Sequence, residues 1–288
     1  MKAISGDRQH FAILGHPIQH TLSPAMHNAA FRALGMNAVY EAFDVTPGQV
    51  ISTLQAMAER GLQGANITVP LKEVAFKGLA DLDRSARVMG AVNTVQFLRK
   101  GPRGFNTDGI GFLRALDEAF GISPRGLKVF VLGCGGAGRA VAIASAMHGA
   151  RSIALADIDP RRVRKLAAGI RRASPKTALE KCTGGPAAWI RAAQTADLVI
   201  HATPIGMRTG EKSLLTPEAF HKGQAAFDLV YNVPETDFMR SARAGGARAV
   251  NGLGMLLHQG AAAFTIWTGK PAPVEVMRKA LKEALCAR

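Results

Sequence analysis

Short apolar runs alternate with segments of helical periodicity along most of the chain. Many of the runs end at Gly, Asn, Thr or Pro, which is typical of buried strands. We expect strands at residues 11–14, 65–69, 91–97, 127–132, 152–156, 198–202 and 225–230. Other segments carry apolar residues at helical spacing, as at Val50, Leu54, Met57 and Leu62. This alternation predicts an α/β fold.

Capping and turn residues mark where helices and units begin. Ser23 before Pro24 predicts a helix with serine as its cap and proline at its first position. Asp108 and Asp159 are predicted caps of the helices that follow them directly. A turn-rich break at residues 121–126 predicts that a second unit starts there.

The length supports two units rather than one. The chain has 288 residues and a mass of 30.4 kDa, enough for two ordinary domains, and it contains neither repeats nor low-complexity stretches. The tail from Gly254 onward is again helical in pattern. Which unit the tail joins does not follow from periodicity.

Composition narrows the class of protein. Hydrophobic residues make up 48% of the chain and charged residues 20%, which is typical of a globular protein and excludes disorder. Three cysteines are too few for a disulfide framework or a cysteine-rich zinc site, so we expect no metal centre. No apolar stretch reaches the roughly 18 to 20 residues that span a bilayer, and the N-terminal run is too short for a signal peptide. We therefore expect a cytoplasmic location.

The net charge of +15 points to anionic partners, ranging from nucleic acid or lipid to a small metabolite. The densest basic run, residues 161–172, has helical spacing and no aromatic side chain on which a base could stack. We interpret it as a solvated helix face. Neither a nucleic acid nor a membrane partner is expected.

A glycine-rich turn follows the apolar run at residues 127–132. Its pattern is GxGxxG, and a predicted helix and a second strand come after it. In such a turn the glycines permit a tight bend, close approach of a pyrophosphate, and close packing of helix on strand. An ordinary strand-to-helix turn is the alternative, but the flanking elements favour a dinucleotide site. We assign its cradle to Gly133, Gly135, Gly136, Ala137 and Gly138.

Asp157 lies at the end of the next predicted strand, 24 residues after Gly133. A carboxylate there accepts hydrogen bonds from the ribose hydroxyls of NAD and repels the 2′-phosphate of NADP. No arginine follows directly, because Ile158 occupies that place, although Arg161 and Arg162 lie one helical turn further on. We expect NAD as the cofactor, with NADP as the alternative.

Compact polar clusters lie in the first half of the chain, at residues 15–24, 64–72, 90–94 and 106–109. Their order and spacing resemble the shikimate dehydrogenase family. The resemblance continues through the glycine-rich turn and through residues 202–207, 228–232 and 252–256, so it covers nearly the whole chain.

The resemblance implies a two-domain α/β fold. An N-terminal α/β substrate domain, residues 1–108, would be completed by C-terminal helices, residues 252–288, around a Rossmann-type NAD(P)-binding domain, residues 109–251. It also implies that Lys72 and Asp108 are the catalytic pair in the reversible reduction of 3-dehydroshikimate to shikimate. The chemistry agrees, because hydride addition to a ring ketone needs a proton for the developing alkoxide, which a lysine held beside a carboxylate can deliver. Considered singly, Lys72 is more simply explained as a surface lysine and Asp108 as a helix cap.

Shikimate carries a carboxylate and three hydroxyls, so its site needs short hydrogen-bonding side chains. By resemblance, residues that would hold the carboxylate are Thr21, Ser23 and Tyr231. Those that would hold ring hydroxyls or the reacting oxygen are Asn66, Thr68, Asn93, Asp108 and Gln259. Ordinary explanations as caps, turn residues or solvated positions stay open for several of them. Further cofactor contacts are implied at Arg162, Thr203, Pro204, Met207, Val230, Gly252 and Met255.

Some positions depart from the family's usual pattern. Thr21 replaces the common serine, and His201 replaces the usual asparagine. Val233-Pro234 follows Asn232, where the family continues directly with proline. At residues 156–159 the chain reads Ala-Asp-Ile-Asp where NADP-specific members carry Asn-Arg-Thr, which resembles the NAD-linked quinate/shikimate branch.

Two alternative activities therefore stay open. One is an NAD-dependent quinate dehydrogenase, and the other is a non-catalytic nicotinamide-sensing or nucleic-acid-binding regulator, suggested by the positive charge. The presence of both Lys72 and Asp108 speaks against the regulator, because a binding module needs neither. A small-molecule substrate and a monomer or homodimer are expected.

Overall fold

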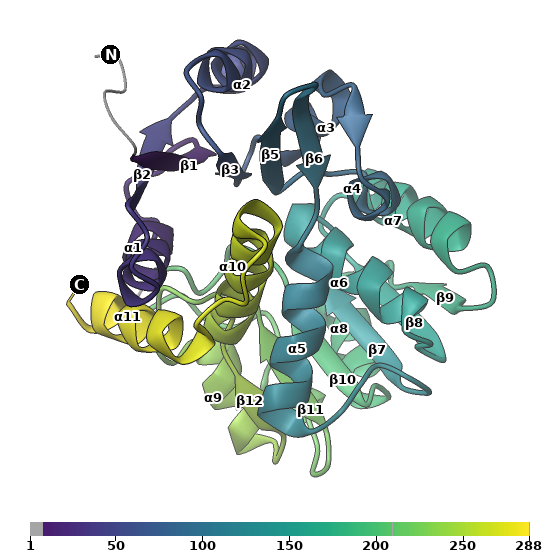
Figure 1. The fold of residues 1–288 in the computed structure, drawn as a ribbon. Coiled ribbons are helices and arrows are strands. Elements are labelled where there is room, and N and C mark those ends of the chain that lie inside the picture. The colour runs from purple at the N-terminus through teal and green to yellow at the C-terminus, as the bar shows by residue number, and fades with distance from the viewer. Residues whose placement is uncertain (1–7, 209, 288) are drawn as a thin grey trace. The chain divides into compact units, whose positions relative to one another are not determined.

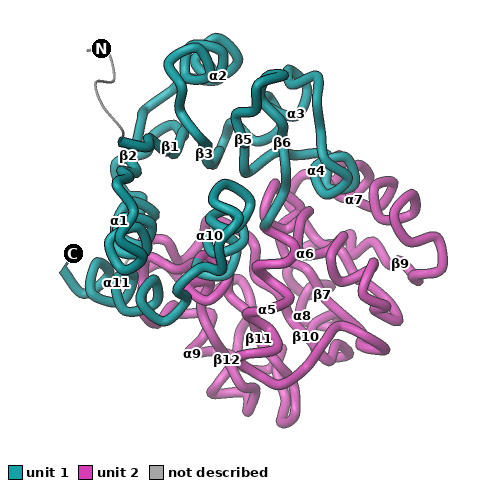
Figure 2. Tube along the Cα trace, viewed as in Figure 1, with its two compact units in different colours: residues 1–107, 257–288 teal, residues 108–256 magenta. Residues whose placement is uncertain are grey.

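A computed structural model describes residues 8–208 and 210–287, and these residues form two compact units (Figure 2). One unit contains the described residues up to Thr107 together with those from Leu257 onward. The other runs from Asp108 to Leu256. Both units combine a six-stranded sheet with helices, which confirms the expected two-domain α/β class.

The first unit is built on a mixed sheet with strand order β2-β1-β3-β5-β6-β4 (Figure 1). Its strands are β1 (Gln9–Gly15), β2 (Ala38–Asp44), β3 (Gly64–Ile67), β4 (Asp81–Leu82), β5 (Thr94–Leu98) and β6 (Gly101–Phe105). The helices are α1 (Ser23–Ala33), α2 (Val50–Glu59), α3 (Lys72–Gly78), α4 (Arg84–Met89) and α11 (Val274–Cys286), and α10 (Leu253–Thr268) has its first four residues in the second unit.

Because of the strand directions in this sheet, several of the connections between strands lie at one edge. β1 runs parallel to β2 and β3, whereas β5 is antiparallel to β3, with Asn66 opposite Thr94. β6 is antiparallel to β5, with Thr94 opposite Phe105. The ends of β1, β3 and β6 and the beginning of β5 therefore lie along the same edge.

The apolar stripe of α2 explains how one face of this sheet is covered. Val50, Leu54 and Met57 are buried in a core that also contains Leu14 and Ile67.

A close contact with Trp267 explains a glycine in the first unit's sheet. The indole Nε1 of Trp267 lies within hydrogen-bonding distance of the Val95 carbonyl, at 2.9 Å. A Cβ atom on Gly64 would lie 2.2 Å from that nitrogen, so the strand needs glycine there.

The second unit has a fully parallel sheet with strand order β12-β11-β10-β7-β8-β9. Its strands are β7 (Lys128–Leu132), β8 (Ser152–Ala156), β9 (Ala178–Lys181), β10 (Leu198–His201), β11 (Ala225–Asp228) and β12 (Arg248–Val250). Its helices are α5 (Asp108–Phe120), α6 (Gly136–Met147), α7 (Pro160–Ala173), α8 (Pro186–Gln194) and α9 (Asp237–Ala244). Followed along the chain, this is the doubly wound order of a Rossmann fold, whose direction reverses between β7 and β10.

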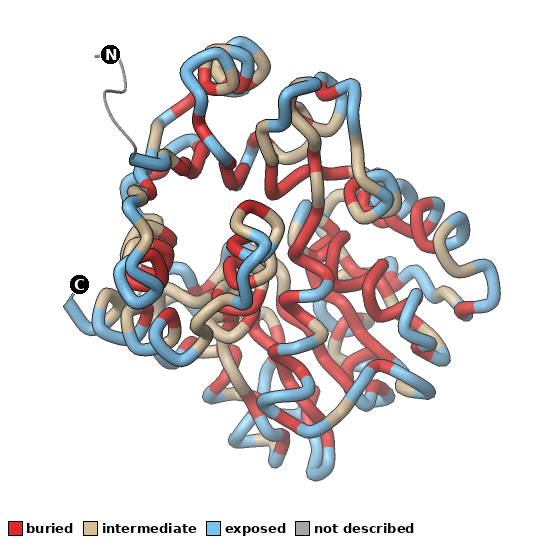
Figure 3. The backbone as a smooth tube through the Cα atoms, in the orientation of Figure 1, coloured by how far each residue is buried: buried red, intermediate tan, exposed pale blue. Residues whose placement is uncertain are grey.

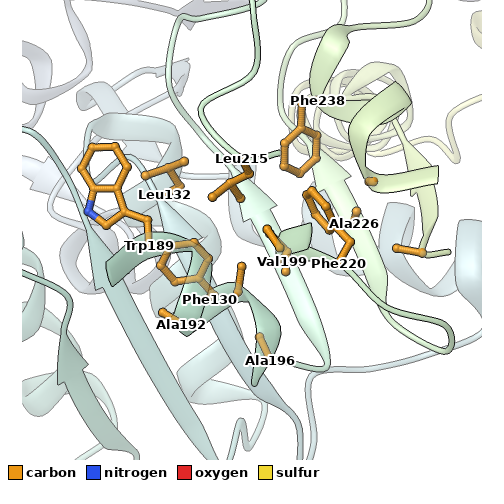
Figure 4. Packing of buried hydrophobic residues seen from close by; sticks show 14 of the residues in the cluster. Phe130, Leu132, Trp189, Ala192, Ala196, Val199, Leu215, Phe220, Ala226 and Phe238 are labelled. Carbon is orange, nitrogen blue, oxygen red and sulfur yellow. The ribbon is translucent and has the colours of Figure 1, made fainter. Parts of the chain in front are cut away.

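The central strands of this sheet are buried, as Figure 3 shows for the second unit. Phe130 and Leu132 of β7 pack in one core with Val199 of β10, Trp189 of α8 and Phe238 of α9 (Figure 4). Continuous apolar strands of this kind are expected where helices cover both faces of a parallel sheet.

Several boundaries differ from those that the sequence pattern predicts. Ser23 is not the helix cap: Leu22 holds that position, and the backbone N–H of Ser23 donates to Thr21 Oγ1 at 3.3 Å instead. β3 ends at Ile67 and β5 begins at Thr94, so both are shorter than the predicted runs 65–69 and 91–97; residues 68–69 and 91–93 lie in the connections instead. The Asp159 cap is confirmed, since its carboxylate accepts from the Arg161 backbone N–H at 2.9 Å.

Candidate functional site

The edge where β1 and β3 end brings together polar segments from distant parts of the chain. Gly15 closes β1, and a Cβ atom there would lie 2.5 Å from Cγ2 of Thr68. The backbone N–H of Thr68 in turn donates to the Leu14 carbonyl at 2.9 Å. Parallel strands offer ligand sites at their carboxyl ends, so this edge is a candidate site within the first unit.

Asn93 is the centre of a buried hydrogen-bond network at this edge. Its Oδ1 accepts from the backbone N–H of Thr107 at 2.8 Å, and its Nδ2 donates to Thr107 Oγ1 at 2.9 Å. Nδ2 also lies 3.3 Å from Oε1 of Gln259, which α10 supplies. The side chain thus holds together the start of β5, the segment after β6 and a C-terminal helix, three predicted site segments.

Asn66 extends the network toward β2. Its Nδ2 donates to the Asn93 carbonyl at 3.0 Å and to Thr94 Oγ1 at 3.1 Å. Its Oδ1 accepts from the phenol of Tyr40 at 2.6 Å. Asn66, Asn93, Thr94 and Tyr40 are each at most 4% exposed, so these bonds are made in a largely dry environment.

Thr21, just before α1, and Ser23, the first residue of α1, add two hydroxyls to the first unit. Ser23 is buried, and its side chain acts to lower the pKa of the Tyr40 phenol, so the two hydroxyls lie near each other. Thr21 is half-buried and accepts from the backbone of Ser23. Tertiary contact with Tyr40 explains why Ser23 does not cap its own helix.

Lys72 and Asp108 occupy the first positions of two helices. Lys72 begins α3, half-buried, and its carbonyl accepts from the Val92 N–H at 3.0 Å, next to Asn93 in the chain. Asp108 is 4% exposed, begins α5 and directly follows Thr107 of the Asn93 network. The backbone therefore attaches each residue to a segment of the network.

The glycine-rich turn of the second unit lies between β7 and α6. Gly133 has φ of +103°, and a Cβ on it would lie 2.6 Å from the Ala202 backbone. A Cβ on Gly138 would lie 1.9 Å from the Gly133 carbonyl oxygen. Both positions require glycine for packing, the first also for its left-handed conformation.

The next two glycines have a different environment. A Cβ on Gly135 or on Gly136 would meet no atom of the described chain within 4 Å. The first N–H groups of a helix lack intrahelical acceptors and favour anions. The open backbone at the start of the twelve-residue α6, with Ala137 in its first turn, therefore fits a dinucleotide pyrophosphate.

Asp157 follows β8 and is fixed by two backbone donors. Its Oδ2 accepts from the Cys134 N–H at 2.7 Å, and its Oδ1 accepts from the Asp159 N–H at 2.8 Å. Ile158 beside it is 85% exposed. Burial, with a smaller contribution from the Asp157 charge, raises the pKa of the Cys134 thiol to about 12, so this cysteine stays protonated.

Two arginines follow closely after Asp157, and their environments differ. Arg161 forms an ion pair with Asp159, its Nε 3.0 Å and its Nη2 3.1 Å from the two carboxylate oxygens. Arg162 is exposed in the first turn of α7. Of the two arginines that could approach a 2′-phosphate, one is thus already paired.

His201 anchors the loop that follows β10. Its Nδ1 lies 2.9 Å from Oδ1 of the fully buried Asp228, and its Nε2 lies 2.6 Å from Thr203 Oγ1. Because the carboxylate must accept, Nδ1 of His201 is the donor in its bond to Asp228. Asp228 also accepts from Thr236 Oγ1 at 2.5 Å and from the Val230 N–H at 3.0 Å.

The other predicted positions of the second unit lie on or beyond this loop. Pro204 and Met207 are exposed, Tyr231 is half-buried after β11, and Gly252 and Met255 are buried. A Cβ on Gly252 would lie 2.4 Å from the Leu229 carbonyl oxygen, which accounts for the glycine by packing.

Sequence reasoning missed Tyr40, Thr94 and Thr107 as members of the polar network. Thr94 and Thr107 stand inside recognised clusters, so their position was the available signal. Tyr40 lies far from those clusters in the sequence and reaches them only through the pairing of β1 with β2 and β3. The one local feature that marks Tyr40 is that tyrosine is rare in this chain, which has two.

The parallel sheet, the open glycine-rich turn and the acidic residue after β8 define a two-unit dinucleotide-binding protein of the α/β class. The chain belongs to the shikimate dehydrogenase family. Residues 13–95 match the shikimate dehydrogenase substrate binding domain, and residues 252–282 match the shikimate 5′-dehydrogenase C-terminal domain.

Similar proteins agree over almost the whole length. The shikimate dehydrogenase (NADP(+)) of Moorella thermoacetica is 48% identical, over 96% of this chain and 93% of its own. The shikimate 5-dehydrogenase of Thermus thermophilus, solved with NADP(H) and shikimate, is 38% identical with a TM-score of 0.85, over 96% and 99%. A quinate dehydrogenase of Corynebacterium glutamicum, solved with NAD, is 30% identical with a TM-score of 0.88, over 96% and 100%.

The described residues contain neither a membrane-spanning helix nor a metal-binding cluster. None of their helices is both long and apolar enough to cross a membrane. Residues 8–208 and 210–287 also hold no group of three or more His, Cys, Asp or Glu side chains arranged to bind a metal ion.

Proposed function

We propose that this chain catalyses the reversible, nicotinamide-dependent interconversion of 3-dehydroshikimate and shikimate. The observation that carries the proposal is the buried network around Asn93, which joins predicted substrate-binding segments at one sheet edge. The backbone connects it to Lys72, through the bond from Val92, and to Asp108, which follows Thr107. Family membership and the named activities of the similar proteins support it.

We assign the proton transfer to Lys72 and its support to Asp108. When bound, the nicotinamide supplies or accepts the hydride. In the reducing direction the ammonium of Lys72 gives a proton to the oxygen that becomes the alcohol, and in the oxidising direction the neutral amine takes it back. We assign to the Asp108 carboxylate the role of accepting a hydrogen bond from the reacting hydroxyl. Both first-turn positions give these side chains a fixed backbone.

The remaining polar residues are proposed to bind the substrate. Hydroxyl groups of Thr21, Ser23 and Tyr231 suit its carboxylate. Those that suit ring hydroxyls are Asn66, Thr68, Asn93 and Gln259. The unit that contains residues 13–95 is proposed as the substrate-binding unit and the unit with the parallel sheet as the dinucleotide-binding unit. Residues at the ends of the parallel strands, from Gly133 to Met255, would line the cofactor.

We propose that NAD is preferred over NADP, which is a finer assignment than the family supplies. The shikimate dehydrogenases of Moorella thermoacetica and Methanopyrus kandleri are both named as NADP(+) enzymes, so they do not support NAD as the main cofactor. The preference rests on three observations of this chain: the Asp157 carboxylate, the exposed Ile158 beside it, and the pairing of Arg161 with Asp159. Arg162 is the residue that could bind a 2′-phosphate and weaken the preference.

One assay tests substrate and cofactor together. Purified protein is mixed with shikimate or quinate and with NAD or NADP, and absorbance is followed at the band of the reduced nicotinamide. We expect the highest kcat/KM with shikimate and NAD. Turnover of quinate alone would favour the alternative, quinate dehydrogenase, which the Corynebacterium relative makes the second candidate. No turnover with any of the four pairs would leave the non-catalytic alternative.

A further inference from the structure

The hydroxyl of Tyr40 lies between two predicted substrate ligands that are far apart in sequence. Its oxygen is 2.6 Å from Oδ1 of Asn66. The Ser23 side chain lies near the same phenol and acts to lower its pKa, against the larger effect of burial. Ser23 opens α1, Tyr40 lies in β2 and Asn66 in β3. One hydroxyl therefore links the proposed carboxylate-binding residue to a proposed hydroxyl-binding residue.

The direction of each bond follows from counting donors and acceptors. The Asn93 carbonyl can only accept, so Nδ2 of Asn66 must face it and Oδ1 must face Tyr40. Tyr40 must then donate its single proton to Asn66. Because that proton is used, the phenol oxygen can only accept from the Ser23 hydroxyl.

The same count of donors and acceptors shows which hydrogen bond the Asn66 side chain can still form with a ligand. Both hydrogens of Nδ2 are directed at protein acceptors, the Asn93 carbonyl and Thr94 Oγ1. Oδ1 retains one lone pair beyond the bond from Tyr40. In this arrangement the Asn66 side chain accepts from a ligand hydroxyl and does not donate to it.

The phenol itself is held rigidly. The backbone N–H and C=O of Tyr40 both bond the Asn28 carboxamide at 2.9 Å, and its ring stacks on His27 with 4.4 Å between centroids. The side chain is 1% exposed. Burial raises the pKa of Tyr40 well above its ordinary value, so the phenol remains a donor.

We propose that Tyr40 is a positioning residue for substrate, which fixes the Asn66 carboxamide and holds the Ser23 hydroxyl until a carboxylate takes its hydrogen bond. The inference rests on the proposed function. A charged acceptor forms a stronger hydrogen bond than a neutral phenol oxygen, so the substrate carboxylate can compete for the Ser23 proton. The bond from Tyr40 to Asn66 persists during this exchange, since it uses a different proton.

Tyr40→Phe tests the inference, because it removes the hydroxyl and keeps the ring. We expect the KM for shikimate to rise about 3- to 10-fold, as for loss of one neutral hydrogen bond, with kcat within about twofold and the KM for the nicotinamide unchanged. The matched control is Ser145→Ala in α6, which removes a fully buried hydroxyl bonded to the Val141 carbonyl at 2.7 Å. It should leave both KM values unchanged.

A purely structural role predicts a different result. Loss of folded protein lowers the apparent kcat and leaves both KM values as they were. An unchanged KM for shikimate in Tyr40→Phe, with an active wild type, would therefore overturn this inference alone. A wild type that does not turn over shikimate would contradict the proposed function and this inference together.

A second measurement on the wild-type protein covers the case in which Tyr40→Phe does not fold. The chain has only two tyrosines, so the ¹³Cζ signal of Tyr40 can be assigned with Tyr231→Phe as reference. We expect shikimate to shift the Tyr40 signal, because the phenol oxygen loses the bond from Ser23. A Tyr40 signal that saturating shikimate leaves in place would refute the proposed exchange.

Discussion

Asp157 accepts a hydrogen bond from the backbone N–H of Cys134, with 2.7 Å between Oδ2 and the nitrogen. The carboxylate that we assign to cofactor choice therefore also joins the glycine-rich turn after β7 to the turn after β8. A carboxylate has about four lone-pair sites, so it can accept from ribose hydroxyls and from the backbone together. Substitutions at Asp157 report on both roles, and Ile158 offers the cleaner test.

Ile158→Arg should shift cofactor preference toward NADP. The new guanidinium places a planar donor beside the ribose site and leaves both backbone bonds of Asp157 intact. We expect the ratio of kcat/KM for NADP to that for NAD to rise about 5- to 150-fold, from a wild type that prefers NAD. Adding Asp157→Asn should extend the shift and lower the Tm. Ile158→Leu is the uncharged control, and a wild-type preference for NADP would count against the assignment.

Lys72→Ala should lower kcat far more than it weakens substrate binding. A group that transfers a proton in the transition state typically accounts for about 10² to 10⁴ in rate. Steady-state kinetics with shikimate separate kcat from KM. The control is Lys77→Ala, an exposed lysine on the same helix, which should behave like the wild type. Near-normal turnover in Lys72→Ala would remove the catalytic assignment.

Asp108→Asn should reduce kcat and also raise the KM for shikimate. The change removes a negative charge from the proposed site and weakens an acceptor for the reacting hydroxyl. Asp117→Asn, at an exposed position of the same helix, is the control. If Asp108→Asn changed only the Tm, its role would be limited to the start of α5.

The stability of the first unit should depend on pH through His27. Burial lowers the pKa of its imidazole to about 3, and neither ring nitrogen has a hydrogen-bond partner among the described residues. The unfolded chain binds a proton near pH 6.5 and the folded one does not. Stability linked to this group is therefore complete above about pH 6.5 and decreases as the pH falls toward 3, by up to about 1.4 kcal/mol per pH unit.

Thermal unfolding at pH 7 and pH 5 measures this effect. His27→Phe keeps a ring against Tyr40 and should show a smaller loss of Tm between the two pH values than the wild type. His221→Gln changes an exposed histidine and serves as the control. Equal losses in wild type and His27→Phe would show that another group dominates.

Sequence patterns predicted the apolar strands at the centre of the second unit well, and the strands that carry charged residues, glycine or proline poorly. β8 has the predicted bounds, and β7 differs by one residue, because both are continuous apolar runs buried in the sheet. β9 and β12 are the two edge strands of the second unit's sheet. They carry charged or exposed residues, so they lack the continuous apolar pattern of a buried strand. β6 contains two glycines and a proline, which locally indicate a turn.

The site shows the same difference between features that local sequence predicts and features that depend on the fold. Residues within family clusters could be named in advance, and Asn66, Asn93 and Gln259 indeed share one network. Tyr40 could not, because its place depends on which strands pair, a property of the sheet rather than of the neighbouring sequence. His201 was noticed as a departure, but its bonds to Asp228 and Thr203 required the spatial order of β10 and β11.

The antiparallel ribbon of β5 and β6 leaves the sheet edge at Thr94 and returns to it at Phe105. The length of this ribbon therefore does not affect the positions of the site residues at its two ends. Residues added in matched pairs at the exposed turn of Arg99 and Lys100 would lengthen the ribbon without moving either end. A fluorophore, an affinity tag or a natural insertion can accordingly be carried at this turn, with Asn93 and Thr107 still facing each other. This gives the enzyme a place where new sequence can be added at little cost to catalysis.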